Sequence, residues 1–372
     1  MWKALQDLIY NGGVVRLLPG HVIMWAIAFT LLYLAVKKRY EPLLLLPIGF
    51  GILVVNLPIT ALMEPNQGLL WYFYHYGIAS GIIPPLIFLG LGAMTDFGPV
   101  IANPKTLLLG AGAQVGLYFT FFATLLAGFN LREAAAIAII GGADGPTTIY
   151  VGSVLAPHLL GATAVVAYTY MALVPIIQPP IMRLLTTKEE RRIVMRNLRP
   201  VGSLEKILFP VVTAVVVMLV VPAAAPLISM FMLGNLFKES GVVERLTRAS
   251  ENEIMNATTV FLGIAVGATM TAQTFLQPRV LFIFFMGLFA FAASTATGIL
   301  LAKVMNLFLK EKINPLIGAA GVSAVPMSAR VVHKVGSEAN KRTYLLMFAM
   351  GPNVAGVIGT LVAAAIFISM LK

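Results

Sequence analysis

The sequence lacks cysteine entirely, and charged residues make up only 11% of its 372 positions. Without cysteine the chain can form neither a disulfide framework, nor an iron–sulfur cluster, nor a thiolate zinc site. Its four histidines are scattered and lack the spacing of metal ligands. So few charges, beside 59% hydrophobic residues, leave too little polar surface for a soluble protein. We therefore predict an integral membrane protein.

Long apolar runs are what the sequence has in abundance. They cover about residues 22–36, 43–62, 77–92, 107–126, 134–155, 161–184, 208–225, 260–275, 280–301, 316–326 and 344–371. A helix needs roughly 20 apolar residues to cross a bilayer. The pattern therefore predicts an all-α polytopic membrane protein with about ten or eleven spans, several of them short or broken.

Basic residues outnumber acidic ones, 26 to 15, and give a net charge of +11. In a soluble protein this charge would indicate nucleic-acid binding. Here the basic residues flank the spans, where they orient a protein in the bilayer, so we expect a lipid bilayer and no nucleic acid as partner. The densest run, residues 186–200, is predicted to be cytoplasmic. It either sets orientation and contacts lipid headgroups or docks a soluble partner, and both alternatives stay open.

The chain resembles itself on either side of this polar run. Asn103 opens an Asn-Pro pair and a glycine-rich stretch that lead to Asp144 in GGADGPT, and Asn314 opens a similar stretch that leads to Asn353 in MGPNVAG. Paired spans interrupted by Gly and Pro indicate a transporter built from two repeats. We predict an N-terminal membrane repeat with a first broken helix (residues 1–185), a polar cytoplasmic connection (186–203) and a C-terminal membrane repeat with a second broken helix (204–372).

An inverted arrangement of the two repeats would bring both broken helices together near the middle of the membrane. Unwound backbone at that depth must line a protein cavity, where its free carbonyl oxygens can bind a cation. Further oxygen donors in these segments are Asp144, Asn314, Asn353, Ser323, Thr147 and Thr148. Such hard donors suit Na⁺ and do not suit soft metals.

Asp144 and Arg330 are the two charged residues in these segments whose presence most needs a functional explanation. Asn353 can be read equally as a side chain that satisfies a kinked backbone, but kink repair does not need the carboxylate of Asp144. Arg330 either neutralises Asp144 when no cation is bound or holds an anionic substrate in a bidentate manner. Its plainer interpretation, a positive helix end at the membrane interface, also stays open.

Four separated motifs carry a family resemblance: IIGGADGPTTIYV, GNLFKESGVVERL, INPLIGAAGVSAVPMSARV and MGPNVAG. Together they resemble the membrane β subunit of the biotin-dependent sodium-translocating decarboxylases, which act on oxaloacetate, methylmalonyl-CoA or glutaconyl-CoA. The resemblance covers nearly the entire chain, and it is specific because the four motifs occur in the same order.

The resemblance implies that this chain decarboxylates carboxybiotin, consumes a proton and uses the reaction to export Na⁺. The family's functional positions fall on Asp144, Asn314, Gly318, Ser323 and Arg330, and Asn353 matches a further one. Asp144, Arg330 and Ser323 are then the expected catalytic residues. Sodium is expected at Asp144, Asn314, Asn353, Ser323 and Gly318.

The resemblance also implies partners and a location. We expect a soluble carboxyltransferase subunit, a biotin carrier subunit and a small membrane-anchored subunit, and a homo-oligomer is compatible with them. Biotin would sit on the carrier and not on this chain, and the location would be the bacterial inner (cytoplasmic) membrane, crossed many times.

Two other classes of function are compatible with the residues alone. A stand-alone Na⁺/H⁺ or Na⁺/organic-anion secondary transporter would need the same repeats and oxygen donors. A structural membrane anchor for soluble subunits would leave Asp144 unexplained. Sodium-stimulated decarboxylation of carboxybiotin separates the first alternative from the decarboxylase.

Overall fold

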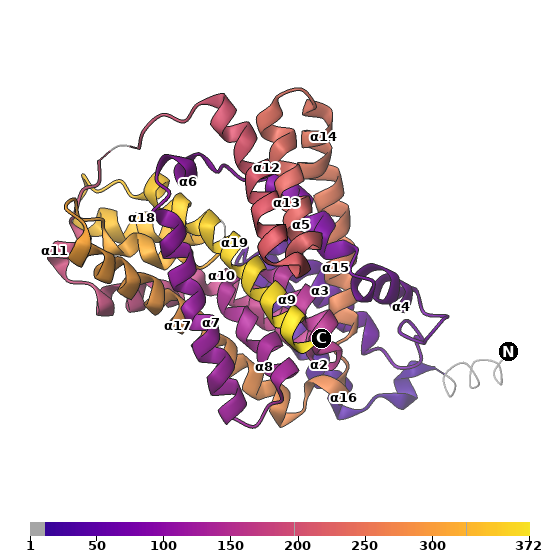
Figure 1. Cartoon of the computed structure of the whole chain (residues 1–372). Coiled ribbons are helices and arrows are strands. Elements are labelled where there is room, and N and C mark those ends of the chain that lie inside the picture. The colour runs from indigo at the N-terminus through magenta and orange to yellow at the C-terminus, as the bar shows by residue number, and fades with distance from the viewer. Residues whose placement is uncertain (1–11, 197, 325) are drawn as a thin grey trace, which may run out of the picture.

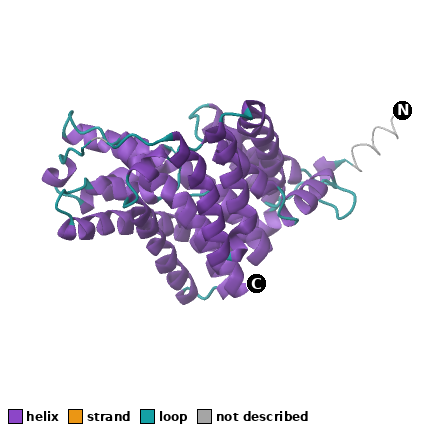
Figure 2. Ribbon diagram, turned by 45° about the horizontal axis from the view of Figure 1, so that its top comes forward, coloured by secondary structure: helices purple, strands orange, loops and turns teal. Residues whose placement is uncertain are grey.

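The computed structural model describes residues 12–196, 198–324 and 326–372, and every regular element in these ranges is helical (Figure 1, Figure 2). Residues 1–11 of the predicted N-terminal repeat, Asn197 of the polar connection and Val325 lie outside the described residues.

The α-helices vary widely in length. They are α2 (Pro19–Val36), α3 (Pro42–Val55), α4 (Leu69–Tyr72), α5 (Ile83–Met94), α6 (Gly98–Ala102), α7 (Thr106–Leu126), α8 (Leu131–Ala138), α9 (Gly145–Leu155), α10 (Leu160–Leu185), α11 (Lys188–Arg191), α12 (Ser203–Val220), α13 (Ala225–Ser240), α14 (Glu244–Ala249), α15 (Met255–Ala268), α16 (Ala272–Phe275), α17 (Pro278–Phe308), α18 (Met327–Ala339) and α19 (Leu346–Leu371). Tighter or wider turns join them: η1 (Gly13–Arg16), η2 (Phe73–Ala79), η3 (Ile139–Gly142), η4 (Pro157–Leu159), η5 (Pro222–Ala224), η6 (Ser250–Ile254) and η7 (Pro315–Gly321).

By length and composition, 6 of the described helices can cross a membrane. They are α2, α7, α10 with η4, α12, α17 and α19. A further crossing is formed if Leu69–Ala79 and Ile83–Met94, which meet at 65°, count as one bent span. The predicted ten or eleven spans are therefore not confirmed. One reason is that several apolar runs fold into elements too short to cross a bilayer, such as the 14-residue α3.

The outer faces of these helices are apolar. In α12 only Pro210 is buried, whereas Val216 and Leu219 are 52% and 77% exposed. A helix that leaves such a face uncovered would aggregate in water, whereas lipid tails solvate it. The chain is a polytopic helical membrane protein, as the composition predicts.

The apolar run at residues 134–155 is not a single span. It forms a hairpin in which α8 and η3 lead in and α9 leads out, with the reversal at Ala143 (φ 50°) and Asp144. Glu133 at the start of the hairpin lies 3.0 Å from His158 just beyond its end. Both ends of this first hairpin therefore lie on the same side of the molecule, which we call the His158 side.

A second hairpin is built from η7 and α18. At its entrance Asn314 Nδ2 donates to the carbonyl oxygens of Arg191 and Ile193, both at 3.0 Å. At its exit Asn340 Nδ2 donates to the carbonyl oxygen of Arg192 at 3.4 Å. Both ends of the second hairpin therefore lie beside the polar connection, on what we call the connection side.

The two hairpins approach each other from opposite ends of α10. This helix begins right after His158 and ends at the polar connection, and its 26 residues span about 39 Å. The tips meet where the backbone N–H of Ser323 donates to the carbonyl oxygen of Gly142 at 2.9 Å. The tertiary structure thus places two interrupted backbones together inside the protein.

The predicted second break at Asn353 is wrong, because α19 runs unbroken from Leu346 to Leu371 with Pro352 inside it. The break lies instead between Gly321 and Met327, where η7 ends and α18 begins. A proline removes only one backbone donor, and a long, largely buried helix tolerates that loss when its neighbours hold it in place. The two matching units are therefore α7 to α10 and α17 to α19, each a long helix, a hairpin and another long helix.

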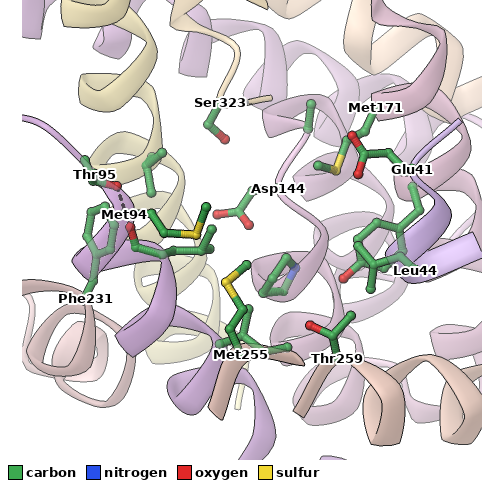
Figure 3. Close-up of a pocket in the computed structure, with 16 residues that line it drawn as sticks. Glu41, Leu44, Met94, Thr95, Asp144, Met171, Phe231, Met255, Thr259 and Ser323 are labelled. Atoms are coloured by element: carbon green, nitrogen blue, oxygen red, sulfur yellow. Dashed lines mark hydrogen bonds between the residues drawn. The ribbon is translucent and has the colours of Figure 1, made fainter. Parts of the chain in front are cut away.

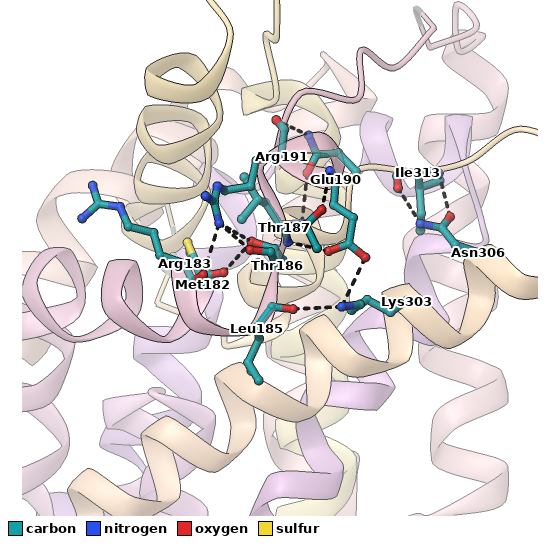
Figure 4. A network of polar contacts seen from close by, with 12 residues as sticks. Met182, Arg183, Leu185, Thr186, Thr187, Glu190, Arg191, Lys303, Asn306 and Ile313 are labelled. Atoms are coloured by element: carbon teal, nitrogen blue, oxygen red, sulfur yellow. Dashed lines mark hydrogen bonds and ion pairs between the residues drawn. The ribbon is translucent and has the colours of Figure 1, made fainter.

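A polar network fixes the entrance of the second hairpin on the connection side (Figure 4). Lys303 Nζ on α17 donates to the carbonyl oxygen of Leu185 at 3.1 Å and lies 3.2 Å from Glu190 of α11. Asn306 bonds both the N–H and the carbonyl oxygen of Ile313 at 2.8 Å. These contacts join the polar connection to α17 just before the hairpin starts.

Glu133 plays the matching part on the His158 side. Its side chain is only 6% exposed, and it accepts hydrogen bonds from Asn130 N–H at 3.0 Å and from Arg279 at 2.9 Å while it faces His158. One carboxylate thus holds both ends of the first hairpin and the start of α17.

We expect Glu133→Ala to lower the free energy of unfolding by about 3 kcal/mol, because it leaves Arg279 and the first turn of α8 without their shared partner. The measurement is thermal or denaturant unfolding of the purified protein in detergent. Glu311→Ala is the control, since that side chain is 66% exposed and pairs with an exposed Arg196, and it should change stability by less than about 0.5 kcal/mol. Equal effects of the two variants would contradict this role of Glu133.

Candidate functional site

Asp144 lies at the tip of the first hairpin, where it caps α9. Gly145 and Pro146 begin the helix, and the Thr147 hydroxyl donates to Asp144 Oδ2 at 2.6 Å. The Thr148 hydroxyl donates to the Asp144 carbonyl oxygen at 2.8 Å. The residue is only 5% exposed, and no ion pair joins it to a described Lys, Arg or His. A buried carboxylate in this position needs a cation or a proton.

Tyr168 of α10 covers this tip. A Cβ atom on Gly145 would lie 2.0 Å from Cε1 of the Tyr168 ring, so the ring rests directly on the glycine. Tyr168 is fully buried, and its hydroxyl has no hydrogen-bond partner among the described residues. Tyr170 differs, because its hydroxyl donates to the carbonyl oxygen of Phe284 at 2.6 Å. Of the two tyrosines, Tyr168 is the one with an uncommitted hydroxyl next to Asp144.

Ser323 lies at the tip of the second hairpin, and Asn353 of α19 lies beside that tip. The Ser323 hydroxyl donates to the Gly142 carbonyl oxygen at 2.6 Å, which ties the two tips together. Asn353 Nδ2 on α19 donates to the carbonyl oxygens of Ala320 and Val322, both at 3.0 Å. Its Oδ1 is buried and has no partner within the described part of the chain. This orphaned amide oxygen is a ready ligand for a cation.

Two predicted sodium ligands occupy other places. Asn314 caps η7 on the connection side, and its amide is fully used, because Oδ1 accepts from Leu316 N–H at 3.1 Å while Nδ2 donates to the polar connection. At Gly318 a Cβ atom would lie 2.1 Å from the Gly298 carbonyl oxygen, so this glycine allows η7 to contact α17 closely. The structure does not bring either residue to Asp144.

Arg330 lies one turn into α18 and is exposed. No ion pair joins it to Asp144 or to another described acidic residue. The predicted neutralisation of Asp144 is therefore not made here. An exposed guanidinium on the hairpin helix that follows Ser323 remains free to hold an anionic group.

Asp144 and Ser323 line one cavity of about 180 Å³ (Figure 3). Its walls come from the starts of α3 and α15, from α5, from the middle of α10, α13 and α19, and from both hairpin tips. The lining residues are Glu41, Leu44, Ile87, Leu91, Met94, Thr95, Ala143, Asp144, Pro146, Tyr168, Met171, Phe231, Met255, Thr259, Ser323 and Val357. Glu41 was not predicted from the sequence, because a glutamate after KKRY reads as an ordinary interfacial charge.

The donors around the two tips define what the site can bind. A carboxylate, hydroxyls, an amide oxygen and backbone carbonyl oxygens are all hard donors. Across the described residues no group of three or more His, Cys, Asp or Glu side chains could hold a metal ion. The arrangement suits a single Na⁺ or a proton at Asp144.

We expect Asn353→Ala to raise the half-saturating Na⁺ concentration about tenfold, because it removes the orphaned amide oxygen and two hydrogen bonds at the break. Asn314→Ala, which acts only at the entrance of the hairpin, should change stability and leave the Na⁺ requirement within about twofold. The measurement is the rate of the assembled complex against Na⁺ concentration. The double variant should show additive effects; a coupling above about 0.5 kcal/mol would place both residues in one site.

The comparisons with known proteins cover the chain from end to end. Residues 20–371 match the model of the family described as Na⁺-transporting oxaloacetate decarboxylase beta subunit. The chain is 53% identical to a methylmalonyl-CoA decarboxylase subunit beta of Propionigenium modestum, over 100% of both chains. It is 52% identical to a glutaconyl-CoA decarboxylase subunit beta of Acidaminococcus fermentans, over 99% of this chain and 98% of that one.

An oxaloacetate decarboxylase beta chain of Haemophilus ducreyi is 48% identical to it, over 100% of this chain and 99% of the relative. Relatives with three different substrates in their names are thus similar to this chain along its whole length, including the two hairpins that build the site. The chain therefore belongs to the family of the Na⁺-transporting oxaloacetate decarboxylase β subunits.

Proposed function

We propose that this chain is the membrane subunit of a sodium-pumping decarboxylase, which removes CO₂ from carboxybiotin and couples this reaction to Na⁺ export. The observation that carries the proposal is the position of Asp144, a buried carboxylate where two hairpin tips meet from opposite ends of α10. Substrate-binding sites built on paired interrupted helices are typical of transporters. The family membership supports the decarboxylation half of the proposal.

Asp144 links the two processes, because one carboxylate holds either a proton or a sodium ion. Decarboxylation breaks the bond between the ureido nitrogen and the carboxylate carbon, and CO₂ leaves while the electron pair stays on the nitrogen. In our proposal Asp144 supplies the proton that this nitrogen takes up. The carboxylate left behind then binds Na⁺ together with Asn353 Oδ1 and carbonyl oxygens of the broken backbone. Protonation and Na⁺ binding therefore compete at Asp144.

Arg330 and Ser323 are proposed to act on the substrate side of the reaction. The guanidinium of Arg330 forms a fork that matches the carboxylate of carboxybiotin. The Ser323 hydroxyl, which bonds Gly142 here, connects movement of one hairpin tip to the other. Binding of the substrate at Arg330 would thus change the position of Asp144 through the contact between the two hairpin tips.

We further infer that the two matching units, α7 to α10 and α17 to α19, are inverted repeats within membrane regions 1–185 and 204–372. Their hairpins enter from opposite sides, as inversion requires. The connection side carries Arg183, Lys188, Arg191 and Arg192, and the excess of basic residues assigns it to the cytoplasm of a bacterial inner membrane. Any membrane crossings beyond the six long helices would then be made by shorter helices such as α3.

The partners follow from the same proposal. A soluble carboxyltransferase subunit loads the biotin, a carrier subunit delivers it to the cytoplasmic face, and a small membrane-anchored subunit holds the assembly, which is also compatible with a homo-oligomer of this chain. Biotin is bound covalently to the carrier and not to this chain. Na⁺ is cargo, held at Asp144 and Asn353 during transport.

The test is made on the purified complex in proteoliposomes supplied with carboxybiotin, with CO₂ release and ²²Na⁺ uptake measured together. We expect CO₂ release to require Na⁺ and ²²Na⁺ to accumulate only while carboxybiotin lasts. Uptake of ²²Na⁺ driven by a pH gradient without carboxybiotin would instead support a stand-alone transporter. CO₂ release at the same rate with and without Na⁺ would contradict the proposed coupling.

A further inference from the structure

The cavity that ends at Asp144 has a second carboxylate in its wall. Glu41 lines the cavity at the start of α3, and Figure 3 shows it across the hollow from Thr95, with Asp144 between them. The hydroxyl of Tyr168, also in the lining, is fully buried and unpartnered among the described residues. Two carboxylates and an uncommitted hydroxyl thus share one small, largely apolar cavity.

The cavity wall near Glu41 belongs to the connection side of the molecule. Thr95, at the end of α5, accepts from Lys238 Nζ at 3.1 Å through its carbonyl oxygen. The next residue, Asp96, lies 3.9 Å from Lys206, which follows the polar connection directly. At the far end of α3 from Glu41, Asn56 Nδ2 donates to the carbonyl oxygen of Met270 at 2.8 Å, and a Cβ atom on Gly161, just beyond His158, would lie 2.3 Å from Thr269 Oγ1. That end of α3 lies on the His158 side, so Glu41 lies toward the opposite, connection side, as Thr95 does.

The backbone fixes Glu41 in this place. The residue has φ 36°, a left-handed conformation that costs a residue other than glycine about 1 kcal/mol or more. Its carbonyl oxygen accepts from Leu44 N–H at 3.1 Å and Leu45 N–H at 2.9 Å, which begins α3. The loop position of Glu41 is thus set by the start of the helix and not by an ion pair.

The charge of Glu41 is not neutralised by a neighbouring side chain. Lys37, Lys38 and Arg39 come just before it in the chain, but all three are exposed. The described residues form no ion pair and no side-chain hydrogen bond with its carboxylate. An unpaired carboxylate in a low-dielectric wall raises the local concentration of cations.

We propose that Glu41 attracts Na⁺ from the connection side into the cavity and so raises the occupancy of Asp144. Glu41 is a positioning residue for the cation, and the ligands remain Asp144 and the broken backbone. The inference rests on the proposed function, because it needs Na⁺ to enter at Asp144. Glu41 is a charged residue that is not among the site residues predicted from the sequence.

The first test is Glu41→Gln in the assembled decarboxylase. We expect the half-saturating Na⁺ concentration to rise about fivefold to tenfold, with the maximal rate at saturating Na⁺ nearly unchanged. The shift should shrink when choline chloride raises the ionic strength, because salt screens the attraction. Glu244→Gln is the matched control, since that glutamate is 73% exposed, pairs with Arg248 and does not line this cavity.

The second test uses the absence of cysteine from the chain. Glu41→Cys provides its single thiol, which is modified in the assembled complex with an anionic or a cationic methanethiosulfonate reagent, and the wild-type complex is treated in parallel to correct for thiols on partners. We expect the anionic adduct to lower the half-saturating Na⁺ concentration toward the wild-type value. The cationic adduct should raise it further, since only the charge differs in sign.

The outcomes separate this inference from the proposed function. An unchanged Na⁺ requirement in Glu41→Gln, or equal shifts for both thiol adducts, would overturn the role of Glu41 while leaving Asp144 in place. If the decarboxylation rate of the wild-type complex did not depend on Na⁺ concentration, the proposed function itself would be contradicted. If Glu41→Gln fails to assemble, the two adducts decide the question, because they are formed on complex that has already assembled.

Discussion

Asp144→Asn is expected to abolish Na⁺ transport and Na⁺-stimulated decarboxylation while the protein still folds and assembles. The asparagine keeps the shape of the side chain and can still accept from Thr147, but the buried site loses its only negative charge at the hairpin tips. Removing one partner from a buried ion pair costs about 3–5 kcal/mol, which corresponds to Na⁺ binding weaker by roughly 10²-fold to 4 × 10³-fold.

The measurement for this variant is Na⁺-dependent thermal stabilisation together with ²²Na⁺ transport. The wild-type protein should gain stability as Na⁺ rises, and the variant should not. Asp96→Asn is the control, because that aspartate is partly exposed and caps Gly98 outside the cavity. A variant at position 144 with normal turnover would remove Asp144 from the mechanism.

The second large effect is expected at Gly318, where the family resemblance implies a functional residue and the structure gives a packing reason. Gly318→Ala places a methyl group 2.1 Å from the Gly298 carbonyl oxygen of α17, and neither backbone can move far. The second hairpin should therefore shift and carry Ser323 away from Gly142. A displacement of about 1 Å at a reacting site can lower a rate about 10²-fold.

The rate and the stability of Gly318→Ala should be measured on the same preparation, since over-packing also costs about 1–3 kcal/mol of stability. Gly202→Ala is the control, because a Cβ atom there meets only Glu205 Oε1 at 3.6 Å, in the polar connection. If Gly318 acted as a Na⁺ ligand alone, the alanine variant would keep its stability and recover its full rate at high Na⁺. That result would contradict the packing role.

The break in the backbone at Asp144 could be predicted from sequence because it depends on local composition. GGADGPT favours a break in a helix, since two glycines precede the aspartate and a proline follows it closely. A carboxylate at such a break inside an apolar run already indicates a cation or a proton.

Local reasoning misplaced the second helix break at Asn353, and it did not foresee that the amide of Asn314 is fully hydrogen-bonded. A Gly-Pro-Asn motif resembles a break, but whether Pro352 breaks α19 depends on the helices that surround it. From sequence alone, the asparagine of an Asn-Pro pair can be interpreted equally well as a helix cap or as a cation ligand. Only the structure shows that Asn314 Oδ1 caps η7 by accepting from Leu316 N–H, while Nδ2 donates to the carbonyl oxygens of Arg191 and Ile193. The paired motifs thus predict two similar segments, but they do not show which residues correspond.

The sequence by itself determined the membrane environment, the helical class and the interruption of the first segment at Asp144, because burial of apolar surface and helix breaking depend on residues close together in the chain. The tertiary structure alone decided that each interrupted segment turns back as a hairpin, that their tips meet at Gly142 and Ser323, and that Glu41 and Tyr168 share the cavity with Asp144. Those contacts join residues far apart in sequence, so no local pattern specifies them. They depend on how helices pack against one another in three dimensions.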